Sequence, residues 1–598
     1  MSADQSSMNQ LITDNIDIWT STVKTKSASG RGSSKKRELY GVKKLRELIL
    51  ELAVRGKLVP QDPTDEPASI LLERIAEEKA QLVKDKKFRK SKKLDDIESS
   101  ECPFNIPRSW QWCYLSDIGA IVGGGTPKSG EESFWTEEGV KWLTPADLYG
   151  LKSKYIGSGK RDITDLGLEK SSAQLLPKGS VLFSSRAPIG YTAIAANDLS
   201  TNQGFKSVVP VFQELSDYVY YFLKRSAKNI DAEASGTTFK EVSGAVVSKV
   251  LTPLPPLNEQ HRIVAKVDEL MTLCDQLEQQ TEASIEAHQV LVTTLLDSLL
   301  LPSATAEGSL TNSADADELM QNWARISEHF DTLFTTEASI DQLKQTILQL
   351  AVMGKLVLQD PNDEPAAKLL ERIAEEKAQL IKEKKIKKQK ALPPIADDEK
   401  PFELPNGWEW CRLGEACRKL TDGSHNPPPN HEGGYPMLSC KEIYDGRIDF
   451  SLASRYVDQG GYDKENKRTA IKSGDVLLNI VASIGRSAIV PQQFPPFVLQ
   501  RNVAVLDSKI ESKFLAEFLM SPIALDYYDK NAKGTAQKVI YLGKLSEMLM
   551  PVPPRSEQDR IVTQLNDLMG ICDQLKARLK ESQSTQLHLT DAIVEQAV

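Results

Sequence analysis

Two glycine- and proline-rich stretches carry the residue types that could do chemistry. The stretch GGGTPKS from Gly123 ends in Lys-Ser like a phosphate-binding loop, but Pro127 occupies the place of the glycine that such a loop requires. The stretch NPPP from Asn426 is similar to the motif with which adenine-N6 methyltransferases hold a flipped base, but Pro429 replaces the aromatic residue that would stack on it. No glycine-rich cofactor loop and no Ser-His-Asp, Cys-His or paired-carboxylate arrangement stands out elsewhere. The sequence therefore predicts no active site.

The chain contains one design twice. The segments 45–84 and 343–382 are identical at 30 of 40 positions without a gap, at an offset of 298 residues (343 − 45), and LLERIAEEKAQL recurs unchanged within them. Further anchors keep this offset: PFNIPRSWQWCYL answers PFELPNGWEWCRL, and LTPLPPLNEQHRIV answers LMPVPPRSEQDRIV. The sequences between the anchors diverge widely. Each half is therefore expected to consist of a helical unit, a variable domain and a second helical unit.

The two opening stretches fall at the same place in the two halves, since Gly125-Thr126-Pro127 corresponds to Gly423-Ser424-His425 at this offset. A loop kept in position but changed in its residues is suited to reading different targets. Hydroxyl, amide and cationic side chains there and in neighbouring stretches match base edges or phosphates, although each serves equally well in a turn or on an ordinary surface. The candidate contact residues are Thr126, Lys128, Ser185, Arg186, Asn202, Gln203, Lys206, Thr237, Lys240, Ser424, His425, Asn479, Arg486, Gln500, Arg501, Asn502, Thr535 and Lys538.

Two apolar stripes predict a pair of long helices. Their spacing alternates between four and three residues, the pattern of a coiled-coil seam with polar members in its middle. About 40 residues at ~1.5 Å each give a rod of roughly 60 Å. The matched stripes favour packing of the two helices against each other, although a helix lying on a globular core would show a similar stripe. Two domains related by a pseudo-two-fold and set apart need opposed helix ends, which predicts antiparallel packing. The stripe positions are Ile263, Val267, Leu270, Cys274, Leu277, Thr281, Ser284, His288, Leu291 and Leu295, and Ile561, Leu565, Leu568, Cys572, Leu575, Leu579, Ser582, Gln586, Leu589 and Ile593.

The variable domains mix short β-type runs, such as SVLFSS and DVLLNIV, with helical runs such as LSDYVYYFLKRSAKN, which predicts an α+β fold for each. The small, polar stretch PSATAEGSLTNSADADELMQN is expected to be a linker. We therefore expect two α+β domains in a tandem pseudo-two-fold repeat, separated by long helices that form an antiparallel coiled coil. The expected segments are 1–102 (helical unit), 103–256 (first variable domain), 257–301 (long helix), 302–322 (linker), 323–400 (second helical unit), 401–554 (second variable domain) and 555–598 (second long helix).

Charge and cysteine usage limit the class of protein. The net charge of −9 lies outside the variable domains, which carry 16 basic and 15 acidic residues in 103–256 and 18 of each in 401–554. Bulk acidity is therefore no argument against nucleic acid. Seven cysteines without a CxxC pair indicate a reducing cytoplasm, and six scattered histidines do not suggest a metal site. No apolar run approaches the ~20 residues of a membrane span.

Together these motifs resemble the specificity subunit of type I restriction-modification enzymes. The resemblance rests on the ILELAVRGKLVPQDP and ILQLAVMGKLVLQDP helices, the PRSWQW and PNGWEW domain starts, and the PLPPLNEQHRIV and PVPPRSEQDRIV helix starts. It covers the chain from about Leu45 onward. The LLERIAEEKAQL segment is similar to that of the subfamily with an extra helical stretch before each target-recognition domain.

The resemblance implies a subunit without catalysis of its own, whose two target-recognition domains each read half of an interrupted double-stranded DNA site. It implies two methyltransferase subunits, which bring S-adenosylmethionine and methylate adenine, and motor-nuclease subunits, which use ATP and Mg²⁺; no cofactor is expected on this chain. The helical units would then repeat because two near-identical partners dock on one chain. A non-catalytic coiled-coil scaffold or tether, whose globular domains bind proteins, would explain the repeat and the charge but not these motifs.

Overall fold

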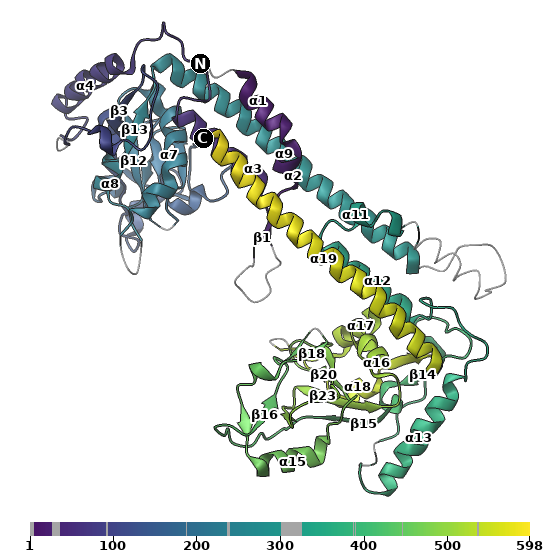
Figure 1. The fold of residues 1–598 in the computed structure, drawn as a ribbon. Helices are drawn as coiled ribbons and strands as arrows, with labels where there is room; N and C mark the ends of the chain where they lie inside the picture. Colours follow the sequence, from purple (N-terminus) through teal and green to yellow (C-terminus); the bar gives the residue numbers. More distant parts are fainter. Residues whose placement is uncertain are drawn as a thin grey trace. The chain divides into compact units, whose positions relative to one another are not determined.

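The computed structural model describes residues 5–26, 36–90, 94–186, 188–235, 240–300, 324, 326–386, 388, 390–444, 446–534 and 537–598. It divides into two compact units, Met1–Ser284 with Gln583–Val598, and Ile285–Ser582. Each unit contains the beginning of one long helix and the end of the other, namely of α9 (Leu257–Leu300) and α19 (Arg555–Ala597) (Figure 1). These helices contact each other, so the predicted α+β fold with tandem domains and contacting long helices is confirmed. The linker predicted at 302–322 lies outside the described residues.

The variable domain of the first unit is built on a five-stranded sheet in the order β4-β12-β9-β10-β7. The central strand β9 is buried along its length, as expected for a strand covered on both faces. A second sheet, in the order β11-β6-β8-β5, contains the parallel pair β11 and β6. The elements are β3 (Gln111–Tyr114), α5 (Leu115–Ile118), β4 (Gly119–Gly123), η2 (Glu132–Phe134), β5 (Trp135–Thr136), β6 (Val140–Leu143), η3 (Pro145–Leu148), β7 (Tyr155–Ile156), β8 (Arg161–Ile163), α6 (Asp165–Glu169), β9 (Val181–Phe183), β10 (Thr192–Ala195), β11 (Ser200–Thr201), β12 (Lys206–Pro210), η4 (Gln213–Leu215), α7 (Ser216–Ala232), α8 (Gly244–Ser248) and β13 (Leu251–Leu254).

The variable domain of the second unit repeats this arrangement despite its different sequence. Its main sheet has the order β15-β23-β20-β21, which matches β4-β12-β9-β10, and its second sheet, β19-β16-β22, keeps the parallel pair as β16 and β22. The elements are β14 (Glu409–Arg412), α14 (Leu413–Ala416), β15 (Cys417–Asp422), β16 (Tyr435–Leu438), β17 (Ile443–Tyr444), β18 (Arg447–Ile448), η6 (Phe450–Leu452), β19 (Tyr456–Val457), α15 (Gln459–Thr469), β20 (Val476–Asn479), β21 (Ser487–Ile489), β22 (Val498–Leu499), β23 (Val503–Ser508), α16 (Ser512–Leu519), α17 (Pro522–Asn531), α18 (Leu542–Glu547) and β24 (Leu549–Val552).

The chain enters and leaves each domain at one place, because the first and last strands pair as β3 with β13 and as β14 with β24. A buried carboxylate in the first turn of each long helix completes this joint. Glu259 accepts hydrogen bonds from Trp110 Nε1 at 2.9 Å and from Gln61 Nε2 at 2.5 Å. Glu557 likewise accepts from the indole of Trp408, at 3.0 Å. Burial raises the pKa of both carboxyls, and the domain starts with PRSWQW and PNGWEW are thereby fixed to the long helices.

In the described residues, the helical units before the domains share two helices, α3 (Tyr40–Val54) with α4 (Ala68–Lys84), and α12 (Glu337–Val352) with α13 (Ala366–Lys382). Short 3-10 turns follow them, η1 (Ser99–Glu101) and η5 (Asp397–Glu399), and α11 (Phe330–Leu333) precedes α12. The first unit additionally begins with α1 (Gln5–Asp14) and α2 (Ile16–Ser21), followed by an antiparallel ribbon of β1 (Val23–Lys26) and β2 (Lys36–Leu39). The sequence did not predict this ribbon.

The buried face of the long helices departs from the predicted stripe after its middle. The positions from Ile263 to Cys274 are buried as expected, but Leu291 is 56% exposed while Val292 is fully buried. In α19, Leu589 is 45% exposed and Thr590 is fully buried. The second half of each predicted stripe was therefore wrong by one residue. A separation of 18 residues, as from Cys274 to Val292, is five turns of a straight helix with 3.6 residues per turn, whereas the stripe assumed the 3.5-residue repeat of a supercoil.

Candidate nucleic-acid interface

A matched pair of loops leaves the main sheet of each domain, after β4 and after β15. The amide of Gly125 donates to a carbonyl of β11 at 2.8 Å, and the amide of Ser424 donates to a carbonyl of β22 at 2.7 Å. Gly124 and Gly423, directly before these residues, lie against the backbone of a neighbouring segment of the same domain. A Cβ on Gly124 or Gly423 would lie 2.0 or 2.2 Å from a carbonyl oxygen, so no larger residue fits without movement of the backbone.

These hydrogen bonds correct the alignment of the two loops by one residue. The constant offset makes Gly423 the equivalent of Gly125, but in the structure the residue that occupies the position of Gly125 is Ser424. The reason is a bulge in β15, where the register shifts between Cys417 and Lys419 and leaves Arg418 as the additional residue. Ser424 and His425 therefore stand where Gly125 and Thr126 stand in the first domain.

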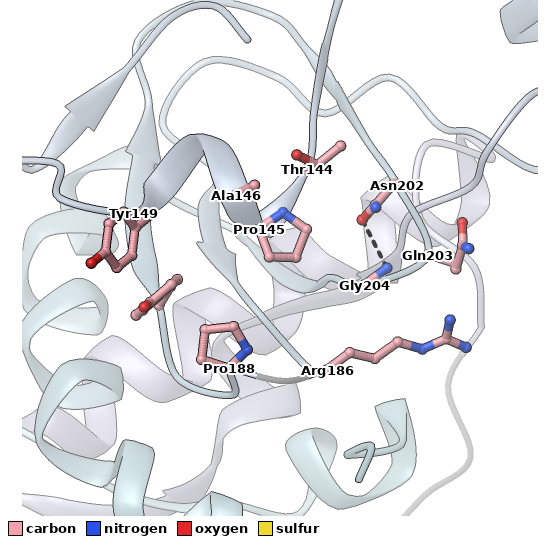
Figure 2. A pocket seen from close by; sticks show the side chains of 10 residues that line it. Thr144, Pro145, Ala146, Tyr149, Arg186, Pro188, Asn202, Gln203 and Gly204 are labelled. Carbon is pink, nitrogen blue, oxygen red and sulfur yellow. Dashed lines mark hydrogen bonds between the residues drawn. The ribbon is translucent and has the colours of Figure 1, made fainter. Parts of the chain in front are cut away.

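A hollow of about 560 Å³ lies beside the first loop (Figure 2). It brings together three predicted residues, Arg186, Asn202 and Gln203, although they come from two separate segments. Asn202 Oδ1 accepts from the amide of Gly204 at 2.9 Å, which fixes the turn, while Gln203 is exposed and bonds through its side chain to the hydroxyl of Thr126. The remaining lining residues are Thr144, Pro145, Ala146, Tyr149, Pro188, Tyr191 and Gly204.

The cationic side chains near this hollow share one carboxylate. Arg186 pairs with Glu241 at 2.9 Å, and Lys206 approaches the same carboxylate at 3.4 Å. The bond from Arg186 lowers the pKa of Glu241, so the carboxylate stays charged. Lys240 pairs separately with Asp231 at 3.2 Å. Arg186 and Lys240 are exposed, and each could exchange its carboxylate for a phosphate.

Three further predictions for the first domain have different outcomes. Lys128 is exposed, and its carbonyl accepts from the indole of Trp135 at 3.1 Å. Ser185 is fully buried, and its backbone bonds to Gly204 and Val242 hold the neighbouring segments together. Thr237 lies outside the described residues.

The loop of the second domain is held by a cluster of polar bonds. Ser424 is buried and donates to Glu465 of α15 at 2.8 Å. Asp422 accepts from Arg468 of the same helix at 2.6 Å, and its other oxygen lies 2.8 Å from His425 Nε2. The side chain of His425 is 56% exposed. Ser424 therefore positions the loop, whereas His425 presents its ring to solvent.

The other predicted residues of the second domain divide in the same way. Asn479 is fully buried and donates to the carbonyls of Cys440 and Ile443, both at 3.1 Å, so it holds a turn. The half-buried Asn502 donates to Cys440 Sγ at 3.6 Å. Arg486 and Arg501 are exposed and Gln500 is half-buried, while Lys538 is exposed and pairs with Asp529. Thr535 lies outside the described residues.

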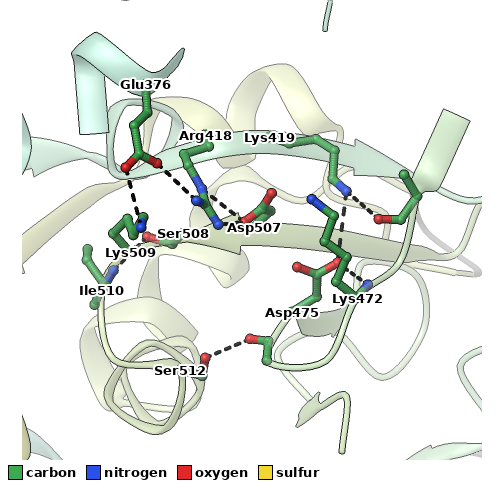
Figure 3. A network of polar contacts seen from close by, with 12 residues as sticks. Glu376, Arg418, Lys419, Lys472, Asp475, Asp507, Ser508, Lys509, Ile510 and Ser512 are labelled. Atoms are coloured by element: carbon green, nitrogen blue, oxygen red, sulfur yellow. Dashed lines mark hydrogen bonds and ion pairs between the residues drawn. The ribbon is translucent and has the colours of Figure 1, made fainter. Parts of the chain in front are cut away.

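The bulge residue also connects the second domain to its helical unit (Figure 3). Arg418 Nε donates to Asp507 of β23 at 3.1 Å, and its Nη1 donates to Glu376 of α13 at 3.0 Å. Lys509 reaches the same glutamate at 3.3 Å. Because a bulge redirects the side chain of its extra residue, this insertion converts a strand position into a contact with α13. The first domain has Ala120 and no bulge at this point.

Sequence reasoning missed the aromatic rim of the hollow. Tyr149 is 77% exposed, and its ring centroid lies 6.4 Å from that of Tyr191. Stacking against exposed aromatic rings is a common way to hold bases or sugars. The sequence feature that could have indicated this rim is a tyrosine directly before a glycine. In the structure Gly150 has a positive φ of 73°, which is typical of a turn.

Metal sites and membrane spans are both absent from the described residues. Within these ranges no group of three or more histidine, cysteine, aspartate or glutamate side chains could hold a metal ion. Over the same residues, no helix has both the length and the apolar character needed to cross a membrane.

Two domains of one design, which present different donors and acceptors at matched loops and are joined by paired long helices, define a two-domain recognition subunit. The family model described as the type I restriction modification DNA specificity domain matches residues 107–287 and 405–582. The chain is 41% identical over 610 residues to the type I restriction enzyme EcoAI specificity subunit of Escherichia coli, covering 99% of this chain and 100% of that one. It is 40% identical over 618 residues to the EcoEI specificity subunit of Escherichia coli, with coverage of 99% and 100%.

A more distant relative is the MjaIX specificity subunit of Methanocaldococcus jannaschii, which is 36% identical over 179 residues, 30% of this chain and 41% of that one. The chain therefore belongs to the family of type I restriction-modification specificity subunits. It is the non-catalytic DNA specificity component of such a system.

Proposed function

We propose that each variable domain reads one half of an interrupted double-stranded DNA site, and that the chain thereby directs adenine methylation and ATP-dependent cleavage by its partner subunits. The observation that carries this proposal is the division within the repeat. The docking helices and the Trp–Glu joints are the same in both halves, whereas the side chains at the matched loops differ. A reader of two different half-sites that binds two similar partners needs this division.

The exposed members of the predicted set supply the contacts. In the first domain these are Gln203 and Arg186 at the hollow, whose amide and guanidinium groups match adenine and guanine edges in the major groove. In the second domain His425, Arg486 and Arg501 take this role from the equivalent loop and its neighbours. Buried Ser185, Ser424 and Asn479 position those loops.

The partners follow from membership of the family. Two methyltransferase subunits dock on the repeated helical units and bring S-adenosylmethionine, and motor-nuclease subunits bring ATP and Mg²⁺. The complex works in the cytoplasm, where the DNA of the cell is. The variable domains are nearly neutral, so the methyltransferase subunits contribute much of the phosphate contact.

The test is the methylated sequence in cells that carry this chain with its partner subunits. Replacing Gln203 and Arg186 by alanine should relax or change the first half-site and leave the second half-site and the spacer as they are. Each lost bidentate contact costs about 1–3 kcal/mol of discrimination. The matched control is Lys170→Ala, an exposed cation of the same domain that does not line the hollow.

If the double variant still directs methylation of the same motif, the hollow is not part of the DNA interface.

A further inference from the structure

The ribbon β1–β2 is strongly basic. Residues 24–37, KTKSASGRGSSKKR, contain six lysines and arginines and no acidic residue, in a chain whose net charge is −9. The register places Lys24 opposite Glu38 but Lys26 opposite Lys36. Glu38 in turn pairs with Lys43 of α3 at 2.8 Å. The two strands of the ribbon therefore carry Lys24, Lys26, Lys36 and Arg37, with Glu38 as their one acidic residue.

Among the described residues the ribbon occurs once, whereas the helices α3 and α4 that follow it recur as α12 and α13. At the offset of 298 residues, 24–37 corresponds to 322–335, NWARISEHFDTLFT, which contains one arginine and two acidic residues. The structure has the helix α11 (Phe330–Leu333) in this stretch. A surface for a partner that binds twice must be present twice, as the docking helices are. A surface present once fits something that the complex meets once, and the DNA between the two half-sites is such an object.

The base of the ribbon is fixed to the helical rod of the first unit. Thr22, directly before β1, shares a buried hydrogen bond of 3.0 Å with Thr590 of α19. Tyr40, directly after β2, donates to Asp591 at 2.8 Å. One and a half turns further along α3, Arg46 pairs with Asp275 of α9 at 2.5 Å.

This anchor lies away from the variable domain. Asp275 is 18 residues from the first residue of α9, where the variable domain joins the helix, and this separation is roughly 27 Å at ~1.5 Å per residue. The ribbon therefore leaves the rod near the middle of the 44-residue helix. A contact made here falls on DNA beyond the half-site that the first domain reads.

We propose that the basic ribbon β1–β2 binds the DNA backbone between the two half-sites, without reading its sequence. This rests on the proposed function, because only a reader of an interrupted site has a spacer. Two antiparallel strands fit a B-DNA groove, and lysine and arginine are the side chains that replace its counterions. The positive charge of the ribbon offsets the negative charge of the long helices that its base contacts.

The experiment uses the full chain bound to its methyltransferase subunits and a synthetic duplex that carries the methylated motif. Lys24, Lys26, Lys36 and Arg37 are all replaced by glutamine. We expect at least about tenfold weaker binding near 0.1 M salt, and a slope of log affinity against log salt reduced by about 2–4, since each lost phosphate contact contributes about 0.9. The matched control removes four exposed lysines of the first variable domain that do not line the hollow: Lys152, Lys160, Lys170 and Lys178 are replaced by glutamine.

A second duplex with neutral methylphosphonates in the spacer separates DNA contact from other effects. It should weaken the unmodified complex and leave the ribbon variant nearly unchanged, while the methylated motif stays the same. The proposal is overturned if the ribbon variant keeps the affinity and salt slope of the control. It is also overturned if the variant instead loses its methyltransferase subunits, which would make the ribbon a protein contact. Failure of the unmodified complex to prefer its motif would count against the proposed function and not against the ribbon alone.

Discussion

Lys419 and Asp475 form a buried pair of opposite charge in the second variable domain (Figure 3). Their nearest atoms are 3.9 Å apart, and their side chains are only 12% and 4% exposed. Burial raises the pKa of Asp475 to about 6 and lowers the pKa of Lys419. Both shifts disfavour the charged forms, so the loss of hydration outweighs the attraction between the partners at this distance. The pair is a cost to the folded state at neutral pH.

The stability of the second unit should therefore depend on this carboxyl. With a folded-state pKa above the ordinary 3.8, the folded protein binds the proton more tightly than the unfolded protein, and stability falls as pH rises from about 4 to about 6. Relative to Asp475→Asn, which cannot ionise, the free energy of unfolding should drop by about 1–3 kcal/mol between pH 4 and pH 7. Urea titrations of both proteins at both pH values measure this, because every other group titrates alike in the two. A difference that grows in favour of the unmodified protein with rising pH would refute it.

At the scale of elements, the helices α3 and α12 each pack against the middle of one long helix and the end of the other, with one shared contact and one different contact. Arg46 pairs with Asp275 and Lys344 with Asp573, both at 2.5 Å and at equivalent positions. Lys44 of α3 pairs with Asp591 of α19 at 3.0 Å. Gln342, the equivalent of Lys44, instead bonds to Thr293 of α9 at 3.2 Å. The contact of Lys44 is therefore specific to the end of α19, and the contact of Gln342 is specific to the end of α9.

A fragment of residues 1–340 contains every surface that the chain uses twice, so two copies should form a symmetric dimer. In that dimer Lys44 would meet Thr293 in place of Asp591. Thr293→Asp should restore the ion pair twice, and at about 0.5–1 kcal/mol for each partly exposed pair the dimer should tighten about five- to thirtyfold. Sedimentation equilibrium measures the dissociation constant.

The control for this prediction is Thr293→Asp combined with Lys44→Gln, which removes the cation and should abolish the gain. A fragment that remains monomeric, or a gain that persists without Lys44, would show that this contact does not select the pairing of the long helices.

The sequence was sufficient for the repeat, the long helices and the α+β domains, because identical segments and apolar periodicity span many residues. It was not sufficient for features that depend on a single residue. The sequence around Arg418 does not indicate a bulge, yet the bulge shifts the alignment of the two loops by one residue. The buried face passed from Leu291 to Val292 because the helix keeps 3.6 residues per turn. Which predicted polar residues hold turns, as Asn479 does, depends on burial that only tertiary structure determines.

At the scale of the whole molecule, we expect the long helices to set the distance between the half-sites. Deleting one heptad from each, 279–285 and 577–583, shortens the rod by roughly 10 Å, about three base pairs at ~3.4 Å each. The methylated motif should then have a spacer about three base pairs shorter, and insertion of one heptad at the same points should lengthen it by about three. An active deletion variant that keeps the original spacer would show that the rod does not act as the ruler.

The central claim is that each variable domain reads its own half-site independently of its position in the chain. It is tested most directly by methylome sequencing of cells whose chain carries residues 401–554 in place of 103–256, with the partner subunits unchanged. The exchange is feasible because β3 with β13 and β14 with β24 close both domains in the same way. The account predicts methylation of an interrupted palindrome built from the second half-site. Methylation that still follows the original asymmetric motif, or a motif that contains neither half-site, would contradict it.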